Sequence, residues 1–190
     1  MYNIIKINIE QVIKMVLHYI DEGIGLRPFK ESDAEEFYTL TINSKENLKK
    51  WLGWLDNIHS AEDTLKHIQF RILEIEKNDG TPLNFAITYK RKIIGTIGFN
   101  SIDKTNKIGT IGYWLSEDYQ GKGIMTKAFK RIVDYGFKEL SLQHIEVRVA
   151  KENYKSRALP ERFSFKTEGV IKEAEWLYDH SVDHVLYSIS

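Results

Sequence analysis

A glycine-containing turn is the part of the chain whose residue types most directly suggest chemistry. It consists of Gln120, Gly121, Lys122, Gly123, Ile124, Met125 and Thr126, between an apolar run and a long amphipathic segment. Glycines allow close backbone approach and positive φ, and the first amides of a helix lack intrahelical acceptors and carry the positive end of its dipole. Such a turn can bind a pyrophosphate, to which Lys122 would add charge and Thr126 a hydroxyl donor. The same glycines also suit a plain tight turn, so both interpretations stay open.

Two other phosphate-binding patterns are excluded, and the histidines do not favour a metal site. A nucleotide-hydrolysing loop requires G-x-x-x-x-G-K-[ST], which is absent, and the dinucleotide fingerprint requires a third glycine or alanine where Thr126 stands. His180 and His184 have the spacing of helical metal ligands but fall in an expected turn and strand, without the glutamate of H-E-x-x-H. No metal is expected.

The turn must be held by a strand before it and a helix after it. Residues Ile108 to Leu115 are rich in β-branched and aromatic side chains, which favours a strand, and Ser116 to Lys122 form a polar loop. The next segment has apolar residues at helical spacing, namely Met125, Ala128, Phe129, Ile132 and Tyr135. We therefore predict a strand, loop and helix unit.

Helices and two further strands are expected before this unit. Three serines can begin helices: Ser32, whose spacing to Glu35 is that of a capping box, then Ser44 and Ser60. The core-facing residues of the second and third helices would be Leu48, Trp51 and Leu52, and Leu65, Ile68, Ile72 and Ile75. Runs Leu83 to Tyr89 and Ile93 to Phe99 predict antiparallel strands with short polar connectors.

The remainder of the chain predicts strands around one short helix. Residues His144 to Ala150 alternate apolar and polar side chains, a helix is expected around Arg157 to Phe163, and Gly169 to Leu177 and Val182 to Ile189 form two last strands. The order of elements predicts an α/β (α+β) fold with a single mixed, mostly antiparallel sheet flanked by helices.

Composition limits the class of protein and its partners. The 190 residues suit one globular domain, with 42% hydrophobic and 28% charged residues. The 27 Lys and Arg balance the 27 Asp and Glu, so no global field attracts nucleic acid or an anionic membrane. The absence of cysteine fits a reducing compartment, and residues 1–20 lack the apolar centre of a signal peptide. We expect a cytoplasmic protein without nucleic-acid or membrane partners.

The residues from Gln120 to Met125 resemble the Q/R-x-x-G-x-G/A signature of the GCN5-related N-acetyltransferase (GNAT) superfamily, with Met125 at its last position. The text around them resembles the RimJ/RimL-type ribosomal-protein acetyltransferase branch, and the resemblance covers about Leu26 to Tyr187. The other matching segments, in the order of that branch, are Ile111 to Leu115, Leu26 to Pro28, Asn47 to Trp54, Asn153 to Ser156, Pro160 to Arg162, and Glu168 with Gly169. Phe163 to Phe165 departs from the usual L-G-F, so a local backbone adjustment is expected there. The resemblance implies one N-acetyltransferase domain over 21–190, after an extension over 1–20 that includes an alternative start at Met15.

The resemblance also implies acetyl-CoA as cosubstrate and assigns its contacts. In the superfamily, the strand matching Ile108 to Leu115 splays from the following strand, and the pantetheine arm pairs with backbone at the positions of Tyr113, Trp114 and Leu115. The amides from Gln120 to Thr126 would bind the diphosphate, and the Asn153 side chain would contact the cofactor.

Acetyl transfer requires a neutral amine, a base for its proton, donors for the oxyanion and an acid for the thiolate. The resemblance implies that Ser156 is the acid and Glu175 the base. Other interpretations remain for each residue, because serine before a helical run commonly caps it and Glu175 could be a solvent-facing carboxylate. Glu173, which has the same parity along the strand, is the rival base.

The acceptor amine can be argued from titration. A terminal amine has a pKa of about 7.7 to 8.0, against about 10.4 for lysine, so far more of it is neutral near pH 7. This favours the N-terminal α-amine of a protein. The resemblance implies that this protein is a ribosomal protein, of the serine or alanine type, and we expect the enzyme to be a monomer or homodimer. Two alternatives are a small-amine (polyamine or aminoglycoside) acetyltransferase and a non-catalytic acetyl-CoA-binding module. Trp51, Trp54 and Trp176 would line the acceptor pocket or pack in the core.

Overall fold

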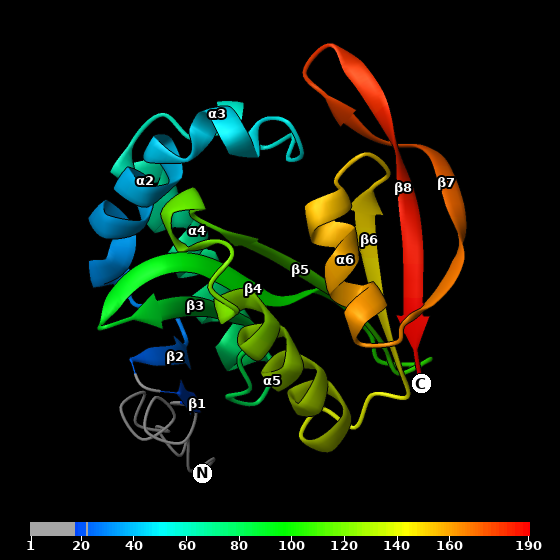
Figure 1. Ribbon diagram of the computed structural model, residues 1–190. Coiled ribbons are helices and arrows are strands. Elements are labelled where there is room, and N and C mark those ends of the chain that lie inside the picture. Colours follow the sequence, from blue (N-terminus) through cyan, green and yellow to red (C-terminus); the bar gives the residue numbers. More distant parts are fainter. Residues whose placement is uncertain (1–17, 22) are drawn as a thin grey trace, which may run out of the picture.

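The computed structural model describes residues 18–21 and 23–190, which form one sheet flanked by helices (Figure 1). The strands are β1 (His18–Asp21), β2 (Ile24–Arg27), β3 (Asn84–Tyr89), β4 (Lys92–Asp103), β5 (Ile108–Leu115), β6 (His144–Ala150), β7 (Lys166–Leu177) and β8 (His180–Ile189). The α-helices are α2 (Ala34–Asn43), α3 (Lys45–Leu48), α4 (Ala61–Lys77), α5 (Ile124–Lys138) and α6 (Tyr154–Arg162). Short 3-10 helices span Glu31–Asp33, Leu55–Asn57 and Glu117–Tyr119.

The eight strands have the spatial order β1-β2-β3-β4-β5-β6-β8-β7. All neighbours pair antiparallel except β5 and β6, which pair parallel. The predicted single, mixed and mostly antiparallel sheet is therefore confirmed. Within the described residues, no helix is both long enough and apolar enough to cross a bilayer.

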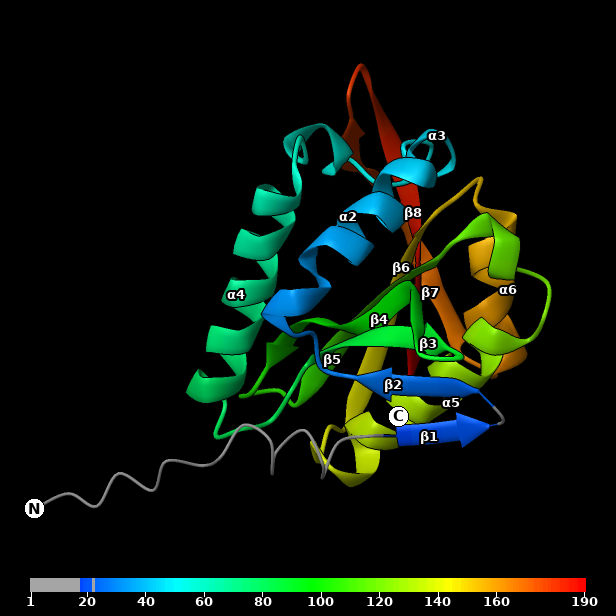
Figure 2. The ribbon, with the colours of Figure 1, turned by 90° about the vertical axis from the view of Figure 1, so that its left-hand side faces the viewer.

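The sheet carries a separate apolar core on each face, with α5 and α6 on one side and α2 and α4 on the other (Figure 2). On the first face, the predicted stripe of α5 is buried: Ala128, Phe129 and Ile132 are fully enclosed against the strands. On the second face, Ile68 of α4 packs in a cluster that includes Trp114 of β5. The alternation of β5 thus sends neighbouring side chains into different cores.

The parallel pairing of β5 and β6 stops before either strand ends. It runs from Ile108 opposite His144 to Ile111 opposite Val147, although β5 continues to Leu115 and β6 to Ala150. The two strands separate beyond this point, as Figure 1 shows. The predicted splayed strand pair is present, and it opens the middle of the sheet.

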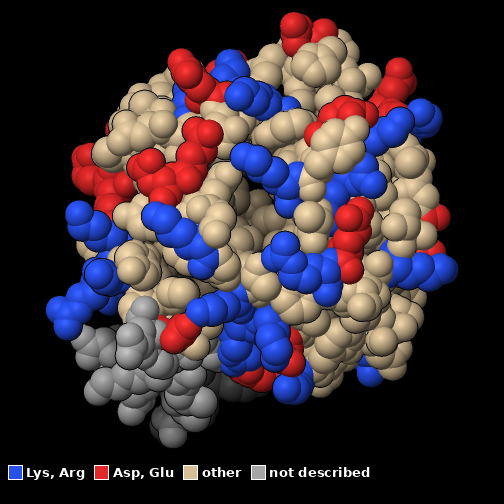
Figure 3. Space-filling model, viewed as in Figure 1, with Lys and Arg blue, Asp and Glu red and all other residues tan. Residues whose placement is uncertain are grey.

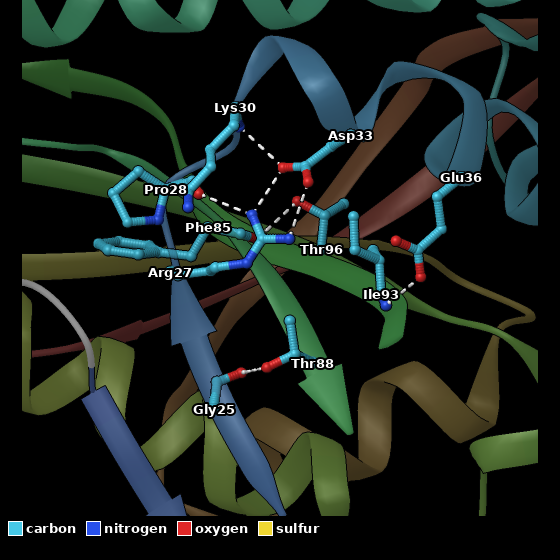
Figure 4. A network of polar contacts seen from close by, with 10 residues as sticks. All are labelled: Gly25, Arg27, Pro28, Lys30, Asp33, Glu36, Phe85, Thr88, Ile93 and Thr96. Carbon is cyan, nitrogen blue, oxygen red and sulfur yellow. Dashed lines mark hydrogen bonds and ion pairs between the residues drawn. The ribbon is translucent and has the colours of Figure 1, made fainter. Parts of the chain in front are cut away.

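A polar network attaches the first helices to the sheet (Figure 4). The Arg27 guanidinium donates to both carboxylate oxygens of Asp33, at 2.6 and 2.9 Å, and the Lys30 N–H donates to the same carboxylate at 2.8 Å. The Ile93 N–H at the start of β4 donates to Glu36 Oε1 at 2.8 Å. Because Asp33 is buried, this bidentate pair fixes where α2, and hence α3, lies over the sheet.

Three local details differ from the sequence expectations. The helix expected at Ser32 is preceded by a 3-10 turn, in which Asp33 instead of Glu35 accepts the backbone N–H three residues earlier. Ser60 does cap α4, with its hydroxyl accepting the Asp63 N–H at 3.3 Å, whereas the Ser44 side chain makes no cap hydrogen bond. Trp51 and Leu52 lie in turns after α3. The proposed extension and its alternative start lie almost wholly outside the described residues.

The segment that replaces L-G-F keeps a glycine-like backbone. Ser164 has a φ of 58°, in the left-handed region, directly after α6. A residue with a β-carbon in this region is strained by about 1 kcal/mol. Ser164 thus adopts a strained backbone conformation, and the chain follows the course that a glycine would take. Phe165, the next residue, is buried.

Candidate functional site

A cavity of about 1180 Å³ passes through the opening between β5 and β6. Its walls come from the segment after α3, from β5, the glycine turn, α6, β7 and β8. Figure 3 shows the hollow near the centre of this face, with Lys and Arg side chains around it. The lining includes every predicted site residue except Lys122.

The glycine turn has the conformation that the sequence analysis required. Gly121 and Gly123 have φ of 72° and 73°, and a β-carbon at either would meet no atom within 4 Å. Gly123 is the N-cap of α5 and provides no side-chain cap, so the first amides of the helix stay available to a ligand. The turn therefore presents an unobstructed helix N-terminus to the cavity, which suits an anionic group.

Side chains beside the turn shape it and add positive charge. The Gln120 amide donates to the Leu115 carbonyl at 3.0 Å, which closes the loop between β5 and α5. Arg162 reaches across from α6 and donates to the Thr126 hydroxyl at 2.7 Å. Lys122 donates to the Asp118 carbonyl at 2.7 Å and lies outside the cavity lining. Arg162, to which sequence reasoning did not assign a role, thus brings a cation to the first turn of α5.

The open edge of β5 offers backbone groups to a ligand. The Ser116 N–H donates to the Ile94 carbonyl at 2.9 Å, across the ladder between β4 and β5. Because antiparallel strands alternate their hydrogen-bonding sides, the backbone groups of Tyr113 and Leu115 point to the opposite side, toward β6. The backbone of Trp114 faces β4, so this residue lines the cavity through its indole.

Asn153 and Ser156 lie at the start of α6. Asn153 is the N-cap, and its Oδ1 accepts the Ser156 N–H at 3.2 Å. The Ser156 carbonyl accepts a hydrogen bond from the Tyr113 hydroxyl at 2.9 Å, and burial raises the pKa of that hydroxyl. The predicted cap role of Ser156 is wrong, because Asn153 performs it. The Ser156 hydroxyl hydrogen-bonds to no residue that the structure describes, and it borders the cavity.

Glu175 faces the same cavity from β7. Its Oε1 accepts the Gly53 N–H at 3.2 Å, and its Oε2 lies 3.3 Å from His184 Nε2 on β8. The hydrogen bond from His184 is the main cause that lowers the pKa of Glu175, with the Gly53 amide adding to it against partial burial. Glu175 is therefore held as a carboxylate in a fixed orientation.

A bulge in β7 separates Glu175 from Glu173. The pairing with β8 jumps from Ile171 opposite His184 to Glu175 opposite Val182, so β7 has two extra residues there. Glu173 lies in this bulge with a φ of 47°, is exposed, and does not line the cavity. The parity that made the two carboxylates rivals is broken by the bulge.

The three tryptophans divide between the cavity and solvent. Trp51 and Trp54 line the cavity, while Trp176 is 65% exposed and lies outside the lining. None of the three is in a buried core, where the sequence pattern would equally have put them. The Tyr178 hydroxyl donates to the Leu52 carbonyl at 2.6 Å, which joins the turn after β7 to the segment that carries Trp51 and Trp54.

Several cavity residues were missed by sequence reasoning. They are Arg71, Arg148, Lys155, Arg162 and His184, and Gly53, whose N–H binds Glu175 from outside the lining, was missed as well. His184 was considered only as a metal ligand, and within the described part of the chain no cluster of three metal-ligating side chains exists. Its even spacing from Leu186 and Ser188 in the last strand was the available signal that it shares their face.

Comparison with known proteins identifies similar chains. Residues 24–166 match the family described as acetyltransferase (GNAT) domain. The chain is 32% identical over 170 residues to the putative ribosomal N-acetyltransferase YdaF of Bacillus subtilis, covering 90% of this chain and 92% of that protein. It is 31% identical over 169 residues to the ribosomal-protein-serine acetyltransferase of Escherichia coli, covering 89% and 93%.

A solved structure extends the likeness to three dimensions. RimL, the ribosomal L7/L12 α-N-protein acetyltransferase in complex with coenzyme A, superposes with a TM-score of 0.85 at 27% identity. The match covers 91% of this chain and 97% of that one. The likeness thus includes β7 and β8, which lie beyond the family match.

Proposed function

Because the chain belongs to the GNAT acetyltransferase family and is an acetyl-CoA-dependent N-acetyltransferase, we propose that it acetylates the N-terminal α-amine of a ribosomal protein. The observation that carries the proposal is the single cavity in which Glu175, Ser156 and the glycine turn meet. The cofactor would enter at the turn and the amine from the side of Glu175.

The cofactor end is suited to coenzyme A in charge and shape. The diphosphate would lie against the amides at Gly121 and Gly123, with the Arg162 guanidinium adjacent. The pantetheine arm would pair with the outward backbone groups of Tyr113 and Leu115, as a further strand would. The thioester would then lie in the opening of the sheet, within reach of α6.

The reaction proceeds by direct attack. The amine nitrogen forms a bond to the thioester carbon, and collapse of the intermediate breaks the carbon–sulfur bond. Glu175 takes the proton that the nitrogen loses, and the Ser156 hydroxyl donates a proton to the leaving thiolate. Attack makes the nitrogen strongly acidic, so a carboxylate whose pKa is lowered still accepts its proton. Glu175 would act on the amine directly or through one water.

The fixed carboxylate favours an amine that is already partly neutral. A terminal amine with a pKa of about 7.7 to 8.0 needs little help to lose its first proton, whereas lysine at about 10.4 needs a stronger base. Trp51 and Trp54 would provide apolar contacts beside the incoming chain end. All these groups come from one copy of the chain, so either a monomer or a homodimer would be active, and ribosomal proteins place the reaction in the cytoplasm.

The test is an acetylation assay with acetyl-CoA and four kinds of acceptor. These are peptides with a free N-terminal serine or alanine, the same peptides blocked at the N-terminus, a blocked lysine peptide, and spermidine. We expect turnover of the free peptides alone, lost in Glu175→Gln and retained in Glu173→Gln. Turnover of spermidine without any peptide would refute the proposed acceptor. Coenzyme A binding without turnover of any amine would indicate a non-catalytic acetyl-CoA-binding module instead.

A further inference from the structure

Arg71 of α4 is a half-buried cation that lines the cavity. Its Nη1 atom is fully buried and makes no hydrogen bond to any residue that the structure describes. The guanidinium lies over the ring of Phe29, with its carbon 4.9 Å from the ring centroid. Burial lowers the pKa of Arg71, against the field of Glu74 one turn along the helix, but a guanidinium stays charged in proteins. Nη1 of Arg71 is therefore a buried, charged donor without an acceptor among the described residues.

Polar side chains of the sheet line the same cavity as Arg71. They are Asn84 of β3, Thr96 and Asn100 of β4, and Thr110 of β5. A β-carbon on Gly112 would lie 2.2 Å from Asn100 Nδ2, so the Asn100 amide lies directly over that strand. Apolar residues would be expected where a helix covers a sheet. The cavity floor here carries amides and hydroxyls instead.

A purely structural role does not account for an arginine at position 71. Helix α4 buries Thr64 and Ile68 against the sheet, and Leu or Met at position 71 would continue that face without an unpaired charge. Burying a charge without a partner is unfavourable, and proteins usually avoid it. The arrangement is stable when an anion enters the cavity and accepts the free N–H groups in the bidentate geometry that arginine favours.

We propose that Arg71 binds a carboxylate of the acceptor, which makes an acidic residue near the N-terminus a determinant of substrate choice. The inference rests on the proposed function and extends it to the acceptor's sequence. The cofactor's phosphates are the other anions available, but their seat at the start of α5 lies on the opposite face of the sheet from α4 (Figure 2). A polyamine would be disfavoured, because the cavity lining carries four cations, Arg71, Arg148, Lys155 and Arg162, against the two carboxylates of Glu117 and Glu175.

The width of the sheet sets the position of the acidic residue. Asn84 on β3 and His184 on β8 are four strand intervals apart in the order of the sheet. At about 4.8 Å per interval this is about 19 Å, and more where β5 and β6 separate beyond Ile111 and Val147. An extended peptide rises about 3.3 Å per residue, so a chain whose amine is at Glu175 brings its sixth residue, or one of the few after it, to Arg71.

The experiment compares pairs of peptides that differ only in a Glu carboxylate or a Gln amide at one position. Peptides with a common free N-terminal residue carry a single Glu at each of positions four to nine, each paired with the Gln peptide. Wild type, Arg71→Gln and Arg71→Lys are assayed for kcat/KM, with Lys66→Gln as a control because Lys66 is an exposed cation of the same helix outside the cavity. Calorimetry with coenzyme A shows that each variant is folded with an intact cofactor end.

In wild type we expect the best Glu peptide to exceed its Gln partner by about 10- to 100-fold, mainly through KM, as for a hydrogen-bonded charge. Arg71→Gln should bring that ratio close to one, Arg71→Lys should keep part of it, and Lys66→Gln should keep all of it. The inference is overturned if wild type shows no preference at any position. It is also overturned if Arg71→Gln lowers both peptides of a pair equally. Turnover of spermidine alone would instead overturn the proposed function.

Discussion

Gly123→Ala separates the strain of the glycine turn from its role in binding. The φ of 73° places an alanine in the left-handed region, which destabilises by about 1 to 2 kcal/mol. For a chain of this size, that lowers the melting temperature by about 2 to 8 °C. No protein atom lies within 4 Å of the new methyl group, so the fold has no further reason to change.

The loss in binding should be larger than this strain. A methyl group in front of the turn keeps the diphosphate from one charge-assisted hydrogen bond, worth about 1.5 to 3 kcal/mol. The dissociation constant for coenzyme A should therefore rise by about 10- to 150-fold. Isothermal titration calorimetry measures this constant, and a thermal melt without ligand measures the strain.

Gly80→Ala is the matched control. Gly80 has a φ of 79° in the turn after α4, and it does not line the cavity. Both variants should melt at similarly lowered temperatures, but only Gly123→Ala should lose affinity. Equal affinities in the two variants would refute the claim that the turn binds the diphosphate.

Three further predictions concern proton transfer and stability. Glu175→Gln should lower kcat by about 100-fold or more on a free peptide, while Glu173→Gln should stay near wild type; equal losses in steady-state assays would reverse the assignment. Because its pKa is lowered, Glu175 stays ionised from about pH 6 to 9, so kcat/KM should follow the neutral amine alone, rising about tenfold per unit up to about pH 8. A break near pH 6 that disappears in Glu175→Gln would contradict this. Arg27→Ala leaves Asp33 buried without its partner and should destabilise by about 2 to 4 kcal/mol in urea unfolding, whereas Lys130→Ala, which removes an exposed ion pair, should change little; similar losses would count against the network in Figure 4.

The fold could be predicted from the sequence because the local residue patterns and the packing of the folded chain require the same helices and strands. The strand ending at Leu115, the glycine turn and the apolar stripe of α5 each follow from a short-range rule, and the structure forms all of them. The Ser32 capping box does not form because Asp33, held by Arg27 of β2, accepts the Lys30 N–H and a 3-10 turn begins before Ser32. Arg27 and Asp33 are only six residues apart, but the capping-box rule considers the helix start alone and omits a partner in the preceding strand.

The candidate site was less accessible to sequence reasoning on its acceptor side. Alternation along β7 could not distinguish Glu173 from Glu175, because the bulge is set by pairing with β8. Arg71 lies among the apolar residues of a helical stripe, and from the sequence alone it would be interpreted as a surface charge. Only the three-dimensional fold shows that it lines the cavity. The cofactor side was simpler, because its residues are almost contiguous from Tyr113 to Thr126.

The hydrogen bond between Gly53 and Glu175 joins segments 122 residues apart in the chain. Closing a loop of this length costs conformational entropy, which the packing of the terminal hairpin must offset. The orientation of the proton acceptor therefore depends on how β7 and β8 sit against the segment after α3, so a substitution in that contact would reduce turnover without touching the coenzyme A end of the cavity.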